Sequence, residues 1–434
     1  MQTKEKYKLS RYNIYHKDGD VQYLWNTYSD ALLKLDAAAQ EYVRTFSGVD
    51  DKSMEFDLLK SNGFIVYEQL DEYGRVCLEE KQAVFTKEPT SILFAIAPGM
   101  GCNYSCSYCF EGSSDLTGVM TAEVANDVVE YICQQLHRNS NVKELHIRWF
   151  GGEPLLFFDI VETISRKVIA YTQQNSIKYS ASIFTNGRYL DSKAVALLRE
   201  LCIGRTQITV DGMSETYCNS KGASCEDFHV VIDNIRCAAE KIRICIRINI
   251  PGNDATEAIK ITDYLLSQCN LKGKVKIYFA YVCDYSLHLT AAHEEFRNYV
   301  HNFFTWVDHV VEHYGITEAK SILPKRLISS CTLIKTSNAC IGPRGELCKC
   351  EHCFGNDAMT IGNIWMGRFF NDAELMYCST VGDHTNKACS LCDYLPVCMG
   401  GCANDRLKGV VKFDCESNKL FMFKLKLLEG GVNI

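Results

Sequence analysis

The stretch from residue 92 to residue 281 constrains the fold most, because short apolar runs alternate in it with longer amphipathic segments. The apolar runs predict buried strands, and the amphipathic segments, such as 121–137 and 227–241, predict helices. A strand–helix–strand succession produces parallel strands with right-handed crossovers. Six such units are too few for a closed eight-stranded barrel, so we expect an α/β chain with an open, partial (β/α)6 TIM-like barrel. The expected strands are 92–98, 144–150, 180–185, 206–210, 243–250 and 274–281.

Residues 1–85 precede the expected barrel and have a pattern of their own. Short strand candidates flank a polar turn, and a further strand follows a short helix that ends near Gly63. Between them, 29–46 carries apolar residues at helical spacing, with Ser29 as the expected N-cap. Short strands around short helices predict a winged-helix-like module. The expected strands are 12–15, 21–24 and 64–67.

Residues 284–330 are expected to bridge the barrel to a third region through a long helix at 290–313. From residue 331 the regular periodicity ends, and glycine and cysteine dominate until a last short helix at 417–428. A segment with few apolar side chains needs another source of stability, which metal ligation can supply. We therefore divide the rest of the chain into a barrel, 86–283, and a C-terminal Cys-rich domain, 331–434.

The chain has 23 cysteines among 434 residues, and eleven of them lie between Cys331 and Cys415. The charged N-terminus lacks an apolar signal core, and no apolar run reaches the roughly 18 residues of a membrane helix. We expect a cytoplasmic protein without a membrane partner, whose thiols serve metal or redox chemistry rather than disulfides. The net charge of −7 and the scattered basic residues disfavour nucleic acid as a partner. The group Lys272, Lys274 and Lys276 is expected on the solvated face of a strand.

Cys102, Cys106 and Cys109 have the spacing CxxxCxxC and follow directly on the first expected barrel strand. Three thiolates on one glycine-flanked loop can hold three irons of a [4Fe–4S] cluster and leave the fourth iron open. Structural zinc is the alternative, but it takes four ligands in tighter pairs. Loops that follow the strands of such barrels carry active sites, so we favour the cluster.

With the aromatic Tyr108 before its last cysteine, this segment resembles the signature of radical S-adenosylmethionine (SAM) enzymes. In that family SAM binds the open iron through its amino and carboxylate groups. One electron then breaks the S–C5′ bond, and the 5′-deoxyadenosyl radical abstracts a substrate hydrogen. The resemblance implies SAM and a [4Fe–4S] cluster as cofactors, and an electron donor such as a flavodoxin or ferredoxin as a partner. It identifies no catalytic residue beyond the cluster.

Further segments match the family in order and spacing. Gly151, Gly152 and Glu153 follow the second expected strand and resemble the GGEP motif, whose acidic residue and backbone receive the SAM ammonium. Asn186 ends the third strand and Thr209 lies in a QxTxDG segment on the fourth, and both resemble residues on the ribose and carboxylate side of SAM. From the residues alone, Asn186 and Thr209 could equally be a turn former and a strand-end hydroxyl.

Two cations complete the resemblance to a SAM site. Arg247 belongs to an RxN segment of the fifth strand, as in the family. Because Ile246, Ile248 and Ile250 would cover the helix-packed face, Arg247 is predicted to point into the barrel. Relatives often carry an arginine after the QxTxDG strand for the SAM carboxylate, and the best match here is Lys221. Lysine supplies a point charge and not a bidentate fork, so this assignment stays open.

The C-terminal cysteines form a second constellation, CxxCxxxxxCxxxC with a further cysteine downstream, preceded by Cys–x(9–15)–Gly–x4–Cys. This pattern resembles the SPASM domain of radical SAM enzymes, although zinc pairs are the alternative. The resemblance implies two auxiliary clusters, hence three [4Fe–4S] clusters in all. It assigns Cys331, Cys350 and Cys402 to auxiliary cluster I, and Cys389, Cys392, Cys398 and Cys415 to auxiliary cluster II.

The fourth ligand of auxiliary cluster I is open among three cysteines. Cys348 is so close to Cys350 that both reaching one cluster would crowd the loop. We therefore choose Cys340 over Cys348 and Cys353, and an open iron that accepts substrate is the alternative.

SPASM relatives modify peptides or proteins, and residues 1–85 help to choose among them. Their SRYN…NT…NGFIV order resembles the leader-binding module of maturases for ribosomally made peptides, which takes the leader as an added strand. We expect a thioether or carbon–carbon cross-link in a precursor peptide with a leader, bound near 21–24 or 64–67. The alternatives are a fold-capping role for the module, a sulfatase-maturating oxidase that makes formylglycine from Cys or Ser without a leader, and a non-catalytic metal-binding scaffold.

Overall fold

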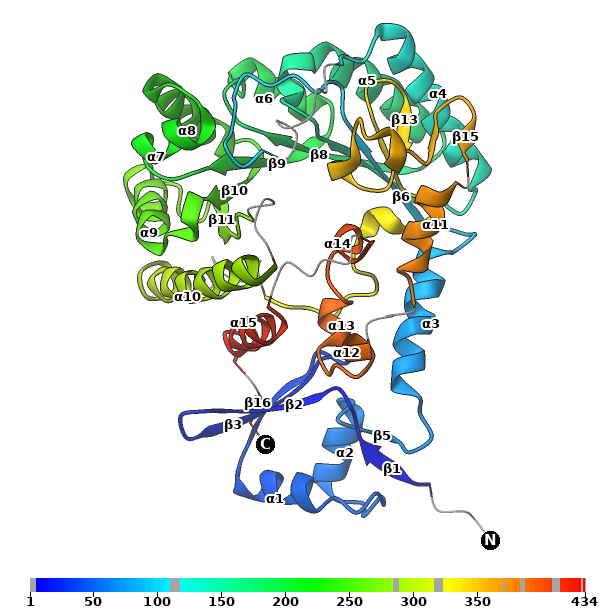
Figure 1. The fold of residues 1–434 in the computed structure, drawn as a ribbon, viewed down its shortest axis with the longest axis vertical. Helices are drawn as coiled ribbons and strands as arrows, with labels where there is room; N and C mark the ends of the chain where they lie inside the picture. Colours follow the sequence, from blue (N-terminus) through cyan, green and yellow to red (C-terminus); the bar gives the residue numbers. More distant parts are fainter. Residues whose placement is uncertain are drawn as a thin grey trace.

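The computed structural model describes residues 5–109, 118–283, 289–315, 323–369, 371–382, 387–407, 414–430 and 432–433. Its largest element is a ten-stranded mixed sheet with the order β11-β10-β9-β8-β7-β6-β12-β13-β14-β15 (Figure 1). Six of these strands run parallel and follow one another in chain order, which confirms the predicted α/β partial barrel. They are β6 (Ser91–Ile96), β7 (Glu144–Trp149), β8 (Lys178–Thr185), β9 (Ile203–Val210), β10 (Arg243–Asn249) and β11 (Val275–Ala280).

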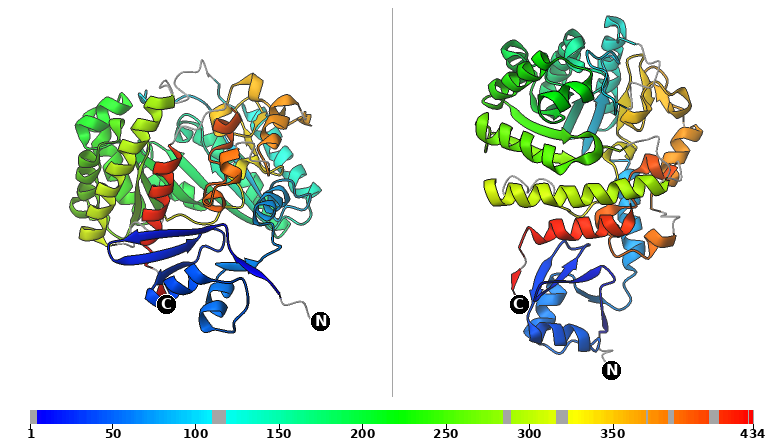
Figure 2. Two further views of the ribbon diagram at one scale, coloured as in Figure 1. Left: turned by 60° about the horizontal axis from the view of Figure 1, so that its bottom comes forward. Right: turned by 60° about the vertical axis from the view of Figure 1, so that its left-hand side comes forward.

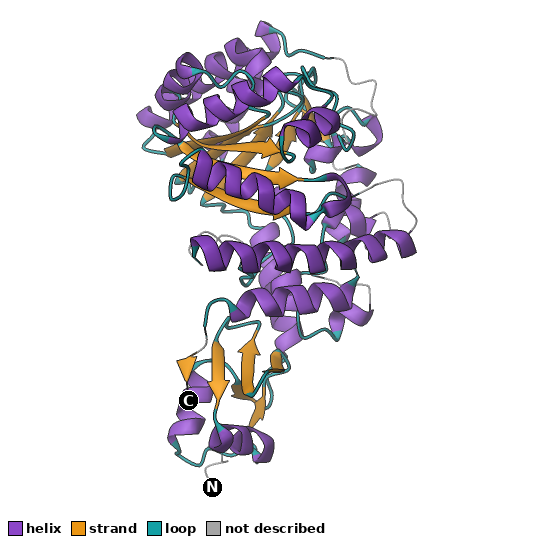
Figure 3. Cartoon of the chain, turned by 90° about the vertical axis from the view of Figure 1, so that its left-hand side faces the viewer, coloured by secondary structure: helices purple, strands orange, loops and turns teal. Residues whose placement is uncertain are grey.

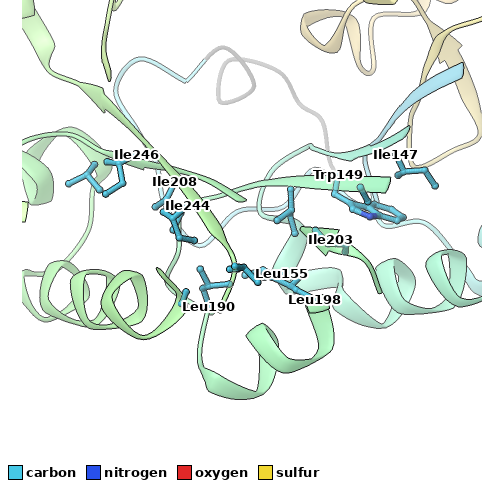
Figure 4. Close-up of a cluster of buried hydrophobic side chains, with 14 of the residues drawn as sticks. Ile147, Trp149, Leu155, Leu190, Leu198, Ile203, Ile208, Ile244 and Ile246 are labelled. Atoms are coloured by element: carbon cyan, nitrogen blue, oxygen red, sulfur yellow. The ribbon is translucent and has the colours of Figure 1, made fainter. Parts of the chain in front are cut away.

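Helices cover the outer face of the parallel strands, and the main core lies between the two layers. Figure 4 shows strand residues such as Ile147, Trp149 and Ile208 facing Leu198 of α6 and Leu190 of the loop before it. Burying each of these side chains stabilises the fold by about 1.5–3 kcal/mol. The helices are α4 (Ala122–Arg138), α5 (Phe158–Gln174), α6 (Ser192–Glu200), α7 (Ser214–Lys221), α8 (Cys225–Ala239) and α9 (Ala255–Asp263).

The barrel sheet continues into the Cys-rich region, which the sequence did not predict. Strand β12 (Ala339–Ile341) pairs in parallel with β6, so that Cys340 lies beside Ala95. Three antiparallel strands then extend this edge: β13 (Glu346–Cys348), β14 (Gly362–Asn363) and β15 (Gly367–Arg368). Short helices follow, at α11 (Asp372–Ser379), α12 (Lys387–Ser390), α13 (Leu395–Cys398) and α14 (Ala403–Leu407). The domain boundary at residue 331 stays a prediction, but one sheet crosses it.

The N-terminal unit contains two small sheets, with the orders β1-β5 and β16-β4-β3-β2. Strand β16 (Val432–Asn433), from the far end of the chain, pairs in parallel with β4. Because β3 lies between β2 and β4, its backbone is already paired on both sides. The other elements are β1 (Tyr7–Leu9), β2 (Asn13–Asp18), β3 (Val21–Asn26), β4 (Leu32–Leu35), α1 (Ala37–Thr45), α2 (Met54–Ser61), β5 (Ile65–Tyr67) and α3 (Glu72–Val84).

The predicted helix over 29–46 is wrong in its first half. Leu32–Leu35 is a strand that pairs with β3, and the helix begins only at Ala37, with Asp36 as its N-cap. Ser29 instead donates its backbone N–H to the Asn26 side chain, in a turn where Asp30 has a φ of 67°. A left-handed residue cannot continue a helix, so the tertiary pairing overrides the helical spacing of the leucines.

Two helices separate the barrel from the N-terminal unit, α10 (Leu289–Tyr314) and α15 (Cys415–Leu427), as Figures 1, 2 and 3 show. The unit rests on α15 and the Cys-rich region, because the buried Trp25 packs against Tyr394 and Phe423 with ring centroids 5.8 and 6.1 Å apart. Thr27 also donates to the backbone carbonyl of Asp393 at 2.6 Å. Among the described residues, no helix is long and apolar enough to cross a membrane.

Candidate functional site

The loops after the barrel strands enclose a cavity of about 370 Å³ at the carboxyl ends of the sheet. We call it the upper cavity. Its walls come from the loop after β6, the loop after β7, the ends of β8 to β11 and helix α7, so residues far apart in sequence meet there. Ten of the predicted residues line it: Cys102, Cys106, Cys109, Tyr108, Gly151, Gly152, Asn186, Thr209, Lys221 and Arg247. Glu153 is the exception.

The three thiols lie on a loop that is bonded to the end of helix α7. The N–H of Ser105 donates to the Lys221 carbonyl at 3.0 Å, and the N–H of Ser107 donates to the Ser220 carbonyl at 2.9 Å. Burial raises the pKa of Cys106 to about 11 and also raises the pKa of Cys102. Both thiols are therefore protonated at neutral pH, and a metal that binds them displaces those protons.

The donor set fits an iron–sulfur cluster better than a single metal ion. Among the described residues, no three Cys, His, Asp or Glu side chains converge on one metal position. A cubane needs no such convergence, because each thiolate binds an iron of its own. The polar and aromatic groups around the three thiols leave room for an organic ligand beside the cluster.

Glu153 is completely buried beneath the upper cavity and does not line it. Its carboxylate accepts hydrogen bonds from the Leu155 N–H at 3.0 Å, the Thr185 hydroxyl at 2.7 Å and the Asn186 N–H at 2.7 Å. These hydrogen bonds tie Glu153 to the loop after β8, and contact of this carboxylate with the SAM ammonium stays a prediction. Glu153 positions the site from behind.

The two glycines before Glu153 are required by the close approach of the loop after β6. Gly151 has a φ of 106°, which only glycine adopts without strain, and an added Cβ would lie 2.6 Å from the Gly99 carbonyl oxygen. At Gly152 a Cβ would collide with the carbonyl of Gly101. The glycines therefore let the two loops touch, and their own backbone faces the cavity.

Lys221 belongs to a buried network whose charge is already matched. Its ammonium lies 3.5 Å from Asp211 and donates to the Tyr108 hydroxyl at 3.2 Å. Asp211 also accepts from Tyr108 at 2.6 Å and from Ser220 at 2.8 Å. Burial alone would lower the pKa of Lys221, but the charge of Asp211 and its neighbours raises it well above the usual value. The ion pair with Asp211 leaves Lys221 little charge for a second carboxylate.

Arg247 is the cation of the upper cavity whose charge is not matched. As predicted, Ile246 and Ile248 on either side of it are buried against the helices, and Arg247 faces inward. Its Nε donates to the Asn249 amide oxygen at 2.8 Å, and it forms no ion pair with a described carboxylate. Asn186 lies across the cavity and donates to the Asn103 side chain at 2.8 Å, which ties it to the cysteine loop.

Residues 96–264 match the family model of the radical SAM superfamily. This stretch holds the cysteine loop, the glycine pair and every strand end that faces the upper cavity except that of β11. These residues form a radical SAM domain. The expected resemblance to radical SAM enzymes is confirmed, and the three thiols and the polar cavity fit the SAM and [4Fe–4S] cluster that are typical of such domains.

The similarity of this chain to known proteins extends beyond the radical SAM domain. The radical SAM cyclopropyl synthase TigE of Paramaledivibacter caminithermalis is 29% identical over 185 residues, which are 39% of this chain and 38% of TigE. The chain thus matches well under two thirds of this relative. The structure of native anSMEcpe with bound AdoMet is 19% identical and superposes on 78% of this chain and 97% of that one, with a TM-score of 0.60. A second anSMEcpe structure, with AdoMet and the Cp18Cys peptide, gives 18% identity, 78% and 97% coverage and a TM-score of 0.58.

Outside the radical SAM domain, the cysteines predicted for auxiliary cluster II lie together between α12 and the start of α15. Burial, followed by the neighbouring thiols of Cys392, Cys389 and Cys415, raises the pKa of Cys398 to about 11. Cys415 is the first residue of α15, so this helix brings the tail of the chain back to the other three cysteines.

The cysteines predicted for auxiliary cluster I lie next to the upper cavity. Burial raises the pKa of Cys331, and the nearby thiol of Cys402 adds to this effect. A hydrogen bond with Cys353, followed by burial, raises the pKa of Cys350. Cys340 is fully buried in β12 and interacts mainly with Cys348 across the strand pair. Of the three candidates for the fourth ligand, Cys353 hydrogen-bonds with the Cys350 side chain, whereas Cys348 donates to the Cys350 backbone carbonyl at 3.3 Å.

Two residues of the upper cavity come from this region and were not predicted from the sequence. Glu351 and His352 lie between Cys350 and Cys353 on a short turn (Glu351–Cys353) and line the cavity. Arg148 of β7 holds this turn through an ion pair with Glu351 at 2.9 Å. Their position between two closely spaced cysteines could have predicted a place in the site, because a turn that holds a cluster also orients the residues within it.

Proposed function

We propose that this protein is a radical SAM/SPASM maturase, which cleaves SAM reductively and modifies residues of a ribosomally made precursor peptide. The observation that carries the proposal is the composition of the upper cavity. Part of its lining is the cysteine loop of the radical SAM domain, and another part is Glu351 and His352 from the turn Glu351–Cys353 of the Cys-rich region. A substrate in this cavity would lie between a SAM cluster and auxiliary cluster I.

The residues of the upper cavity divide the binding of the cofactors among them. Cys102, Cys106 and Cys109 would hold the cluster, which supplies the electron that cleaves SAM. The exposed backbone of Gly151 and Gly152 would receive the SAM ammonium. Arg247, whose charge is unmatched, would bind the carboxylate in place of Lys221, and Asn186, Thr209 and Tyr108 would contact the rest of the molecule.

The thiol groups of the Cys-rich region support two further clusters. Cys331, Cys350 and Cys402 would hold auxiliary cluster I, with Cys353 replacing Cys340 as the fourth ligand because its thiol hydrogen-bonds with the Cys350 thiol. Cys389, Cys392, Cys398 and Cys415 would hold auxiliary cluster II. Iron analysis of two variants tests the choice: Cys353→Ala should lose about four irons, and Cys340→Ala should keep its iron while losing stability. The opposite result would restore Cys340.

The N-terminal unit would bind the leader as an added strand. One of the two strands predicted to bind it, however, has no free edge. Residues 21–24 belong to β3, which is paired on both sides, so this prediction is wrong. Strands β2 and β5 each pair on one side only within their sheets. The second predicted edge, 64–67, contains β5 and remains available, and β2 is an additional and longer candidate.

A peptide is the substrate class that the likeness to solved structures favours. A solved protein of the same fold was crystallised with a peptide, and this chain adds an N-terminal unit built from small sheets. A sulfatase-type oxidase is the second candidate, because the superposed structures are those of anSMEcpe. Leader dependence separates the two: modification of a core peptide should need the leader in the maturase and not in the oxidase.

The SAM cluster is tested with the triple variant Cys102→Ala, Cys106→Ala and Cys109→Ala of the anaerobically reconstituted full chain. We expect it to lose about four irons and all reductant-dependent 5′-deoxyadenosine formation. The matched control is the triple alanine variant at Cys133, Cys202 and Cys237, which lie outside every predicted cluster and should keep both. Formation of 5′-deoxyadenosine by the first variant would refute the proposal.

A further inference from the structure

A second, larger cavity lies below the upper one, inside the barrel, and has a volume of about 860 Å³. We call it the lower cavity. Phe184 and Gln207 line both cavities, so the two are adjacent along the axis of the barrel. The strand register arranges the inward-facing residues in rows that run across the sheet. One row is Arg148, Ser182, Arg205 and Arg243, and the next toward the carboxyl ends is Phe184, Gln207, Cys245 and Lys276.

The charged residues of the lower cavity all have the same sign. Two of them are matched by an acid outside it, Arg148 by Glu351 and Lys274 by Glu240. The remaining four form no ion pair or hydrogen bond with any described residue, and no described acidic residue lines the cavity. These four are Arg205, Arg243, Lys276 and Lys325. Lys274 and Lys276 are exposed, as expected for the solvated face of a strand, and this face also lines the lower cavity.

The register makes this accumulation of charge unfavourable for the isolated chain. Arg205 and Arg243 are direct neighbours on adjacent strands, and like charges in that position repel. His146 experiences the same potential: burial, followed by the charges of Arg148 and Arg205, lowers its pKa to about 4. An anionic ligand would relieve the repulsion, whereas a strand face that only met water would gain nothing from it.

We propose that the lower cavity binds an acidic segment of the substrate peptide, with its carboxylates beside Arg205, Arg243 and Lys276. The inference rests on the proposed peptide maturase and deepens it. A segment held there would enter from the amino ends of the strands, and its next residues would pass Phe184 and Gln207 into the upper cavity. The lower cavity would thus select precursors that carry Asp or Glu close to the modified residue.

The shape of the lower cavity favours a peptide over other polyanions. It is a depression inside a barrel, lined by strands on several sides, and its size suits a short extended chain rather than a nucleic-acid duplex. The polar Ser182 and Gln207 side chains offer hydrogen bonds to a peptide backbone. Stacking platforms of the kind that bind single-stranded nucleic acid are limited there to Phe184.

Binding of defined peptides to the full-length holoenzyme tests the inference by fluorescence anisotropy. The probes are fluorescein-labelled alternating Gly-Glu and Gly-Gln peptides of equal length. The wild type should bind the acidic probe at least about tenfold more tightly than the neutral one at low salt, and the difference should shrink as salt screens the charges. The variant Arg205→Gln, Arg243→Gln, Lys276→Gln should bind both probes equally.

The matched control is Arg138→Gln, Arg199→Gln, Lys193→Gln, which removes the same charge from exposed positions on the outer helices. It should keep the preference for the acidic probe. Equal loss in both variants, or no loss in the first, would overturn the inference, as would an oligothymidylate or inorganic phosphate that displaces the acidic probe at a lower concentration than the unlabelled acidic peptide. Formation of 5′-deoxyadenosine by the wild type without peptide reports separately on the proposed function, so the two can fail independently.

Discussion

The two cavities of the barrel share several strands but differ in their most deeply placed charges, although Arg247 above is unmatched and Arg148 and Lys274 below are matched. In the upper cavity, the ammonium of Lys221 is matched by Asp211, and Glu153 below it is held by three hydrogen-bond donors. In the lower cavity, Arg205 and Arg243 stand side by side with no described acid near them. Internal pairing keeps a site in shape before its ligand arrives. Unpaired cations of one cavity, in contrast, find their counter-charges only when an anionic ligand binds.

The difference has an energetic consequence. A buried ion that loses its partner costs several kcal/mol, because the remaining charge has left water without compensation. An exposed cation that is neutralised costs little and can even relieve repulsion. Substitutions in the upper cavity should therefore act on folding, and substitutions in the lower cavity should act on binding.

The largest effect is expected from Asp211→Asn, which leaves Lys221 buried without its counter-charge. We expect a loss of about 3–5 kcal/mol in the free energy of unfolding, measured by urea denaturation of the metal-free chain. Asp233→Asn removes an exposed partner of Arg236 and should cost less than about 1 kcal/mol. The double variant Asp211→Asn, Lys221→Met should recover much of the loss. If Asp211→Asn matches the exposed control, the buried pair does not stabilise the site.

Glu153→Gln should have a smaller effect of the same kind. The amide keeps one acceptor oxygen but turns an NH2 group toward N–H and O–H donors, so we expect a loss of about 1–3 kcal/mol. The same urea denaturation measures it. Glu200→Gln, at an exposed carboxylate that only pairs with Arg166, is the control and should change little. An unchanged midpoint for Glu153→Gln would mean that the loop after β8 does not depend on this carboxylate.

The lowered pKa of His146, about 4, predicts a pH dependence that originates in the lower cavity. The unfolded chain takes up the imidazole proton near pH 6.5, whereas the folded chain resists it until about pH 4. Over this window the unfolded state binds more protons, so the free energy of unfolding should fall as the pH falls from 6.5 to 4. His146→Gln should flatten this slope, and histidine NMR should report the ring titration directly. A ring that titrates near 6.5 would contradict a positive potential there.

The smallest effect on stability is expected for Arg243→Gln. Removing one of two neighbouring like charges should leave the free energy of unfolding within about 0.5 kcal/mol or raise it slightly. Urea denaturation of this variant beside Arg199→Gln, an exposed helix cation, provides the comparison. A loss above about 2 kcal/mol would show that Arg243 is structural, and the contrast between the cavities would then fail.

Sequence patterns predicted the barrel well, because its strands are apolar runs whose length and spacing depend on local residues. They failed where the conformation of a segment depends on the strand with which it pairs. Leu32–Leu35 has helical spacing yet pairs with β3, and the three residues of β12 are too few for any periodicity. Motifs named the residues of the upper cavity but not their orientation, so the hydrogen bonds that Glu153 accepts from Thr185 and Asn186 were not foreseen. The sequence likewise shows that Lys276 is charged, but it does not show that this residue lines a cavity of the barrel.

The parallel pairing of β12 with β6 has a consequence for any attempt to divide this protein. Strand β6 is apolar, with Phe94, Ala95 and Ile96 almost fully buried, and β12 covers its outer backbone edge. A fragment that stopped before Ala339 would expose that edge as an unprotected template for strand addition, and such edges promote aggregation. The barrel and the Cys-rich region should therefore be expressed, purified and subjected to limited proteolysis as one unit.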